Sequence, residues 1–248
     1  MLLQKEKILS KIHSPVAVHL YDGVDSTNNE AKRRLDTDGM HLYATTHQTA
    51  GRGRRGHDFY SPKDTGLYMT LSFPLLGDPT DIQKVTCAAA VAVCEAISTL
   101  SDRRPQIKWV NDIYIDGKKV AGILTELLCD KENQPAAVIV GIGLNLTTEH
   151  FPAEFADRAG SIGDIEPNDL CGTVADRLIH LFGSLIDNSV IEKYKRLNLC
   201  IGHTVAFTKD GFEHKAKAVD ITADGGLAVE ENGKRTVLHS GEISVIVR

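Results

Sequence analysis

The stretch IKWVNDIYIDGKKVAGILTELL (107–128) decides the fold class of this chain. Two β-favouring runs, 107–115 and 118–128, flank the dipeptide Asp116-Gly117, which supplies the positive φ angles that a tight β-turn needs. The stretch therefore predicts an antiparallel hairpin. A hairpin here breaks the regular alternation of strand and helix that a doubly wound parallel sheet requires.

The segments on either side of the hairpin mix strands and helices. Residues 81–100 contain few charges and much alanine, which predicts a largely buried helix. Helical propensity also marks 28–35, 168–186 and 190–197, whereas 16–21, 41–49, 66–75 and 136–147 are predicted strands. Because hairpins and helices are mixed in this way, the sequence predicts an α+β fold with a mixed sheet.

The composition of the chain changes near Leu199. From 203 to 248 there is no helical period, and short alternating runs are separated by Asp210-Gly211, Asp224-Gly225-Gly226 and Asn232-Gly233. Turn signals at this density predict a small antiparallel β-barrel. The predicted domains are therefore 1–199 and 200–248.

Composition excludes several functional classes. The 248 residues are 42% hydrophobic, and a net charge of −5 argues against bulk adhesion to nucleic acid or anionic lipid, so an anion site would have to be local. The five cysteines are odd in number and form no C-x-x-C pair, which disfavours disulfides and zinc. Lysines and glutamate interrupt the apolar start, so we expect no membrane segment and a cytoplasmic location.

The hexapeptide GRGRRG (51–56) has the G-x-G-x-x-G spacing of a dinucleotide-binding loop. Such a loop must open a helix, because the pyrophosphate sits at the helix N-terminus. Pro62 and Gly66 follow the hexapeptide and disfavour a helix, so the match is interpreted as accidental. One short copy in an acidic chain also does not resemble an RNA-binding arginine tract.

An anion-binding loop is the remaining functional interpretation of the hexapeptide. No aspartate or glutamate occurs from 39 to 57, so Arg52, Arg54 and Arg55 have no neighbouring carboxylate in sequence. Guanidinium groups match carboxylates and phosphates, and glycines allow close backbone approach. Taken alone, the loop fits a solvated surface segment equally well.

Four segments together resemble biotin protein ligases: VDSTN (24–28), HQTAGRGRRGHDFYSP (47–62), KWVNDIYIDGKKVAGIL (108–124) and GIGLNL (141–146). The resemblance covers nearly the whole chain. It implies a catalytic domain with the mixed-sheet fold of class II synthetases and biotin ligases, followed by an SH3-like barrel. One departure is Val110, where the family commonly has proline.

The resemblance implies an ATP-dependent ligase. Such enzymes join biotin to ATP with Mg²⁺, form biotinoyl-5′-AMP and pyrophosphate, and pass biotin to a lysine of a biotin carboxyl carrier protein. The carboxylate of biotin must approach an α-phosphate although both are negative, so fixed cations should offset the repulsion. By resemblance, Arg54 and Lys119 are the catalytic cations.

The resemblance also assigns binding residues. The biotin site would comprise Ser26, Thr27, Asn28, Gln48, Gly51, Arg52, Gly53, Arg54, Lys119 and Gly122, and Gly143 would also make room for ligand. The nucleotide site would comprise Arg54, Phe59, Asn111, Asp112 and Asn145, with Asp112 as the Mg²⁺ ligand. Because the ureido end of biotin is neutral, hydroxyls and amides are suitable partners for it.

Several of these residues have structural alternatives. The segment Thr27–Glu30 matches a capping box, which would explain Thr27 as a helix cap. Asp112 could be a turn residue, Phe59 a loop anchor and Trp109 a core residue. A solvated lysine beside the turn describes Lys118 better than Lys119.

Three other functions compete with biotin ligation. Lipoyl and octanoyl ligases also form acyl adenylates, but their loop usually has two arginines before a glycine triplet. A biotin-sensing repressor needs a winged helix, and the segment before the first predicted strand is too short for one, so we expect no specific DNA binding. A pure binding module would not need both the arginines and Asn111-Asp112. Family members are often homodimers, and the sequence neither requires nor excludes that state.

Overall fold

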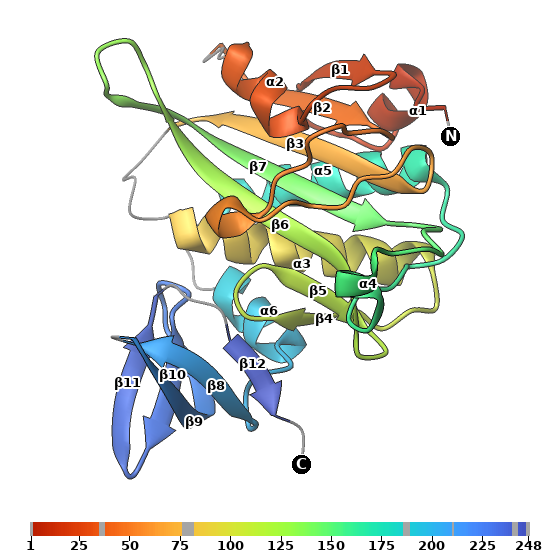
Figure 1. Cartoon of the computed structure of the whole chain (residues 1–248). Coiled ribbons are helices and arrows are strands. Elements are labelled where there is room, and N and C mark those ends of the chain that lie inside the picture. The colour runs from red at the N-terminus through yellow and green to blue at the C-terminus, as the bar shows by residue number, and fades with distance from the viewer. Residues whose placement is uncertain are drawn as a thin grey trace.

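Two β-sheets organise the chain (Figure 1). The structure, a computed structural model, describes residues 2–34, 38–75, 82–185, 189–209, 211–239 and 243–246. A seven-stranded sheet has the order β1-β2-β3-β7-β6-β5-β4, and a five-stranded sheet has the order β11-β10-β9-β8-β12. Helices and strands are intermixed along the chain, which confirms the α+β prediction.

The larger sheet is mixed because its first pair of strands is parallel and the other pairs are antiparallel. In spatial order its strands are β1 (Ala17–Tyr21), β2 (His41–Thr45), β3 (Gly66–Pro74), β7 (Pro135–Asn145), β6 (Lys118–Cys129), β5 (Asp112–Ile115) and β4 (Gln106–Lys108). The central strands β3 and β7 are almost wholly buried, which places the core at the middle of the sheet.

The predicted hairpin is present, but its first arm is not one strand. Asp116 and Gly117 have φ angles of 50° and 75° and join β5 to β6, as predicted. The predicted single strand over 107–115 is wrong, because the chain reverses between Lys108 and Asp112, which face each other across β4 and β5. Residues 108–112, called the KWVND turn below, contain a cis peptide bond between Trp109 and Val110. The reversal places Asn111 and Asp112 on a tight turn.

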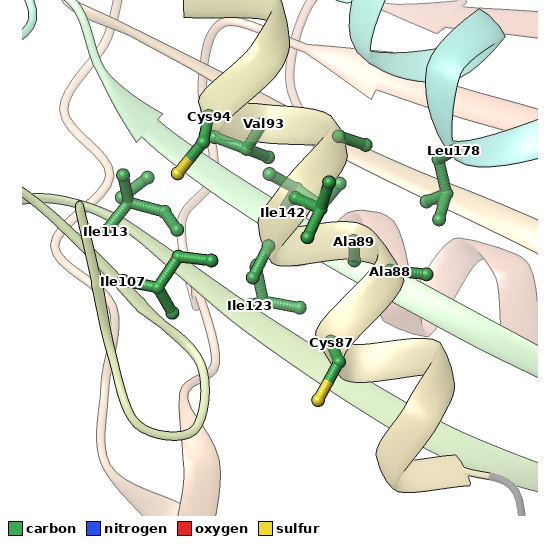
Figure 2. Packing of buried hydrophobic residues seen from close by; sticks show 14 of the residues in the cluster. Cys87, Ala88, Ala89, Val93, Cys94, Ile107, Ile113, Ile123, Ile142 and Leu178 are labelled. Atoms are coloured by element: carbon green, nitrogen blue, oxygen red, sulfur yellow. The ribbon is translucent and has the colours of Figure 1, made fainter. Parts of the chain in front are cut away.

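Three helices cover one face of the large sheet: α3 (Ile82–Leu100), α5 (Pro167–Gly183) and α6 (Ser189–Leu197) (Figure 1). The predicted helix over 81–100 is confirmed from Ile82, and Asp81 lies outside the described residues. Figure 2 shows α3 packed between Leu178 of α5 and sheet residues such as Ile123 and Ile142. By length and composition α3 could span a membrane, but 67% of it is buried inside this fold.

Two helices lie away from that layer. Helix α2 (Thr27–Arg33) packs on β3, and the short α4 (Ala153–Ala156) follows β7. The sequence does not predict a further helix, α1 (Lys5–Leu9), which packs on α5. The Ile8 side chain is fully buried there, and the Gln4 backbone N–H donates to Asn168 Oδ1 at 2.6 Å. The N-terminal segment is thus part of the core packing.

The C-terminal sheet agrees with the predicted run of short antiparallel strands. Its strands are β8 (Thr204–Lys209), β9 (Phe212–Ile221), β10 (Leu227–Glu231), β11 (Lys234–Leu238) and β12 (Ile243–Ile246). The fold fits an SH3-like domain, although no pairing that would close it into a barrel joins β11 to β12 among the described residues. Asp210 of one predicted turn and Val247 of the last predicted strand lie outside those residues. The boundary between 199 and 200 stays a prediction.

All five cysteines are free, as the sequence predicted, and four of them are buried. Burial raises the pKa of the Cys200 thiol to about 11 and that of Cys171 to about 12, and it also raises the pKa of Cys87 and Cys94. These thiols therefore stay protonated in the folded chain at pH values where the unfolded chain has lost those protons.

We expect the free energy of unfolding to fall as the pH rises from about 9 towards 11. An unfolded thiol ionises near pH 9.0, so above that pH the unfolded chain binds fewer protons than the folded chain and is favoured. Urea unfolding between pH 7 and 11 measures this slope. The variant Cys171→Ala should show a shallower slope, and a stability that stays constant to pH 11 would contradict the prediction.

Candidate active site

A cleft of about 1080 Å³ opens on the face of the large sheet opposite α3, beneath the arginine loop (residues 51–59). It brings together predicted site residues from five separate segments. Those that line it are Ser26, Thr27, Asn28, Gln48, Arg52, Gly53, Arg54, Phe59, Asn111, Asp112, Lys119, Gly122, Gly143 and Asn145. Gly51 is the only predicted site residue that is not part of the lining. The functional roles of these residues remain predictions.

The arginine loop is a narrow hairpin closed by its own backbone. The Phe59 N–H donates to the Gly51 carbonyl at 3.0 Å, and the Gly53 N–H donates to the His57 carbonyl at 2.7 Å. At its tip, the short helix η1 (Arg54–Gly56) requires a φ of 77° at Gly56. A strand, β3, follows the loop instead of a long helix, which confirms that the glycine spacing is not a dinucleotide-binding motif.

Gly51 shapes the base of this loop. A Cβ atom there would lie 2.4 Å from Ser61 Oγ and 2.5 Å from the Phe59 carbonyl oxygen. Any larger residue would therefore push the two arms of the loop apart. Since Gly51 does not line the cleft, its predicted contact with biotin stays a prediction, and its visible role is structural.

Uncharged polar groups occupy one end of the cleft, where α2 begins. The Thr27 backbone N–H donates to Gln48 Oε1 at 2.8 Å, and Gln48 Nε2 donates to Ser61 Oγ at 3.1 Å. Thr70 of β3 lies behind them, with its Oγ 2.8 Å from Thr27 Oγ and 2.6 Å from Asn28 Oδ1. Sequence reasoning missed Thr70 because it lies inside a strand whose other residues are mostly apolar.

The predicted capping box is wrong. The residue that precedes α2 is Ser26, its side chain makes no capping hydrogen bond, and Thr27 is already helical. Glu30 pairs with Arg33 and Arg34 instead of reaching back to the helix start. Gln48 takes over the capping from a different segment, which a local sequence pattern cannot reveal.

Asn28 is fixed from three sides. Its Nδ2 donates to Glu126 Oε2 at 2.8 Å, and the other oxygen of Glu126 pairs with Lys32 at 2.7 Å. Its Oδ1 accepts from Thr70, and a Cβ atom on Gly141 would lie only 2.1 Å from that oxygen. The absence of a side chain at 141 therefore makes room for the Asn28 amide.

Charged groups gather at the hairpin side of the cleft. Lys119 Nζ lies 2.6 Å from Asp112 Oδ1, but that oxygen has no aligned hydrogen bond, so the contact is an ion pair. Arg54 Nη1 donates to Asn111 Oδ1 at 3.4 Å, and Asn111 Nδ2 donates to the Ile123 carbonyl at 2.9 Å. The two predicted catalytic cations thus each contact one member of the Asn111-Asp112 pair.

The Phe59 ring lies on the sheet between two glycines. A Cβ atom on Gly143 would be 2.5 Å from the ring, and one on Gly122 would be 3.1 Å from it. In this structure the ring fills space that the sequence analysis assigned to a ligand. The alternative in which Phe59 anchors the loop describes this arrangement, and its predicted contact with an adenylate would require the ring to move.

Asn145 lies at the end of β7 and is 5% exposed. Its Nδ2 donates to the Gly160 carbonyl at 3.1 Å, but its Oδ1 is buried without a hydrogen-bond partner among the described residues. A buried acceptor of this kind is costly unless a donor reaches it. Asn145 is therefore suited to accept a hydrogen bond from a ligand.

The cleft also contains charged residues that the sequence analysis did not single out: Lys108, Glu154, Arg158, Glu213 and Lys215. Arg158 follows α4, and its carbonyl accepts from the Lys119 N–H at 2.8 Å, which ties this segment to the hairpin. Glu213 and Lys215 lie on β9, so the C-terminal sheet forms part of the cleft wall. Lys108 begins the segment KWVNDIYIDGKKVAGIL, but no local motif marks Glu154, Arg158, Glu213 or Lys215.

Comparison with known proteins relates the chain to ligases. Residues 22–145 match the model of the biotin/lipoate A/B protein ligase family. The bifunctional ligase/repressor BirA of Bacillus spizizenii is 35% identical over 167 residues, which cover 64% of this chain and 50% of that protein. The biotin--[acetyl-CoA-carboxylase] ligase of Mycobacterium tuberculosis is 29% identical over 236 residues, which cover 88% of this chain and 85% of that protein. The chain spans about half the length of the first curated relatives that it matches.

A solved structure shares both sheets. The biotin protein ligase from Aquifex aeolicus in complex with biotin and ATP superposes with a TM-score of 0.77 and 26% sequence identity. The superposition covers 93% of this chain and 98% of that one, so it includes the C-terminal sheet as well as the cleft.

Proposed function

Because the chain belongs to the biotin/lipoate A/B protein ligase family, we propose that it activates biotin with ATP and transfers the biotinoyl group to a lysine of a carrier protein. The observation that carries the proposal is the division of one cleft into two chemical halves. One half holds neutral hydroxyls and amides around Thr27 and Gln48, and the other holds Arg54 and Lys119 beside Asn111 and Asp112.

The charged half suits the activation step. A carboxylate oxygen of biotin forms a bond to the α-phosphorus of ATP, while the bond from that phosphorus to pyrophosphate breaks. Negative charge accumulates on the phosphate oxygens, and preorganised cations stabilise it. Arg54 and Lys119 are preorganised for this role, because each is already held by a neighbour on the KWVND turn.

The neutral half suits the ureido ring of biotin. Its hydroxyls and amides can both donate and accept hydrogen bonds, as a neutral urea requires. Thr27, Asn28 and Gln48 are already oriented by Thr70, Ser61 and the start of α2. The pocket therefore needs little reorganisation before a ligand binds, which favours affinity.

Magnesium is proposed to accompany ATP. The Asp112 carboxylate lines the cleft, where its Oδ1 already pairs with Lys119. Mg²⁺ usually binds through one or two carboxylates together with phosphates and water, so one carboxylate in this place fits the ion. When bound, the ion would neutralise charge on the phosphate oxygens, and Asp112 would then divide its charge between the ion and Lys119.

The remaining partners are also proposals. A biotin carboxyl carrier protein is the proposed acceptor. The five free cysteines of this chain support the cytoplasm as the location of the chain itself.

The net charge of −5 supports an absence of specific DNA binding, which a titration of DNA at physiological salt tests. Homodimer formation is proposed on family resemblance alone, and sedimentation with and without biotin measures it.

Exchange of labelled pyrophosphate into ATP tests the proposed function. Biotin, lipoate and octanoate are offered separately, because the family includes ligases for biotin and for lipoate. We expect exchange with biotin only. Exchange that depends on lipoate or octanoate would replace the proposal with the competing ligase, and no exchange with any acid would reject acyl adenylation.

The variant Gly53→Pro is expected to release biotinoyl-AMP into solution faster than the wild type. Proline removes the N–H that donates to the His57 carbonyl at 2.7 Å, so the arginine loop loses a bond that closes it. The release is measured by trapping free adenylate after a single turnover. As a comparison, Gly56→Pro should have the same effect, because its φ of 77° is incompatible with proline. Equal release from all three proteins would show that the loop does not retain the intermediate.

A further inference from the structure

The KWVND turn is tied to its own sheet mainly at its second half, where Asn111 exchanges two hydrogen bonds with Ile123 and Asp112 pairs with Gly122 of β6. Its strands β4 and β5 form only three residue pairs, and β4 is the last strand in the sheet order. Yet this turn carries Asn111 and Asp112, on which the nucleotide side of the cleft depends. Trp109 and Val110, in the first half of the turn, are held by groups outside the sheet.

The first outside support comes from the C-terminal sheet. The Trp109 indole Nε1–H donates to the Gly225 carbonyl at 3.0 Å, and the Trp109 side chain is only 3% exposed. Gly225 lies in the turn between β9 and β10, which sits tightly on α3, because a Cβ atom there would be 3.0 Å from Cys87 Sγ. The same carbonyl also accepts from Gln83 Nε2 of α3 at 2.7 Å.

The second support comes from α6 and the segment that follows it. The Tyr194 hydroxyl donates to the Val110 carbonyl at 3.0 Å, and the Tyr194 side chain is fully buried. Burial raises the pKa of this hydroxyl well above its ordinary value, so it remains a donor at any ordinary pH. Beyond α6, the Leu199 N–H donates to the Ile107 carbonyl at 2.9 Å. Residues after 190 thus hydrogen-bond to the turn at Trp109 and Val110 and to Ile107 just before it.

We propose that Trp109 and Tyr194 are positioning residues that lock the KWVND turn to the C-terminal part of the chain and thereby place Asn111 and Asp112 for the nucleotide. The identity of the nucleotide rests on the proposed function, whereas the two hydrogen bonds do not depend on it. Both bonds are buried, so loss of the Tyr194 hydroxyl leaves the Val110 carbonyl without that donor, and loss of the indole N–H removes the bond that joins Trp109 to Gly225. The uncharged biotin end of the cleft belongs to α2 and β3, so the two bonds act directly on the nucleotide side and reach the biotin site only through Arg54 and Lys119.

The test compares three variants of the full chain. Trp109→Phe removes the indole N–H, and Tyr194→Phe removes the hydroxyl. Gln83→Met removes the other donor to the Gly225 carbonyl and is the matched control, because Gln83 touches the C-terminal sheet but not the KWVND turn. Pyrophosphate exchange gives KM for ATP and for biotin, and hydrogen–deuterium exchange reports the backbone of residues 106–115.

We expect Trp109→Phe and Tyr194→Phe each to raise KM for ATP roughly five-fold, the effect of one lost hydrogen bond, with a smaller rise in KM for biotin. Deuterium uptake over 106–115 should rise in both variants. Gln83→Met should change either quantity less than about two-fold. If Trp109→Phe does not fold, the comparison of Tyr194→Phe with Gln83→Met decides.

Three results would overturn the proposal. One is an equal effect of all three variants, which would indicate general docking of the C-terminal sheet. Another is an equal rise of KM for biotin and for ATP. The third is unchanged deuterium uptake over 106–115 in both turn variants, a readout that does not depend on the reaction. Absence of biotin-dependent pyrophosphate exchange in the wild type would reject the proposed function. Deuterium uptake over 106–115 would still show whether Trp109 and Tyr194 hold the KWVND turn in place.

Discussion

Replacement of Lys119 by alanine is expected to slow formation of the adenylate about 100-fold while leaving the fold intact. Loss of one preorganised charge that acts in the transition state has an effect of this size, roughly 3 kcal/mol. The side chain is 34% exposed and belongs to no hydrophobic cluster, so its removal opens no cavity in the core. Single-turnover measurement of adenylate formation gives the rate, and thermal unfolding checks the fold.

Lys118→Ala is the matched control for this prediction. Lys118 is the adjacent residue, carries the same charge and contacts the Asp157 carbonyl instead of the Asp112 carboxylate. We expect its rate to stay within about two-fold of the wild type, as for most surface substitutions. If the two alanine variants react at similar rates, Lys119 has no specific part in adenylate formation. The ion pair between Lys119 and Asp112 is then not needed for that step either.

The second large effect is expected from Gly141→Ala, a change of one methyl group. The new Cβ atom would lie 2.1 Å from Asn28 Oδ1, and Asn28 is 4% exposed and bonded to Thr70 and Glu126, so it cannot move aside freely. We expect biotin to bind at least about ten-fold more weakly, because the displaced amide disturbs Thr27 and Thr70 as well. Overpacking should also reduce the free energy of unfolding by roughly 1–3 kcal/mol.

Titration calorimetry with biotin measures the first effect, and urea unfolding measures the second. Gly183→Ala is the matched control, because no described atom beyond its chain neighbours and its own helix backbone lies within 4 Å of the Cβ position at the end of α5. Biotin affinity should be unchanged there. Wild-type affinity in Gly141→Ala would mean that Asn28 is not part of the biotin pocket.

The fold was predictable wherever local chemistry determined it. Asp116-Gly117 specified a two-residue turn, and the alanine-rich apolar run specified α3, because positive φ angles and apolar periodicity act over a few residues. The reversal at Trp109 was not predictable in this way. Its flanking residues favour β structure, and the groups that hold it, the Tyr194 hydroxyl as donor and the Gly225 carbonyl as acceptor, lie far away in sequence.

The residues of the candidate site also divide into those that a sequence pattern marks and those that only the folded chain brings together. Glycine and charge spacing located the arginine loop, and resemblance located the Asn111-Asp112 pair and placed both in one pocket. The supporting residues Thr70, Ser61 and Glu126 carry no pattern, because their roles arise only when strands distant in sequence become neighbours. Gln48 shows this most clearly, since it completes a helix start that lies 21 residues before it.

The contact between Trp109 and Gly225 also gives the molecule an optical reporter. Trp109 is the single tryptophan among the 248 residues, so intrinsic fluorescence comes from one known place without any introduced label. That place is where the two sheets meet, two residues before the Asn111-Asp112 pair at the proposed nucleotide end of the cleft. Emission should shift to longer wavelength when the C-terminal sheet detaches and water reaches the indole, before the large sheet itself unfolds. A denaturation curve followed at this wavelength, set beside circular dichroism, would therefore separate loss of the joint from loss of the fold.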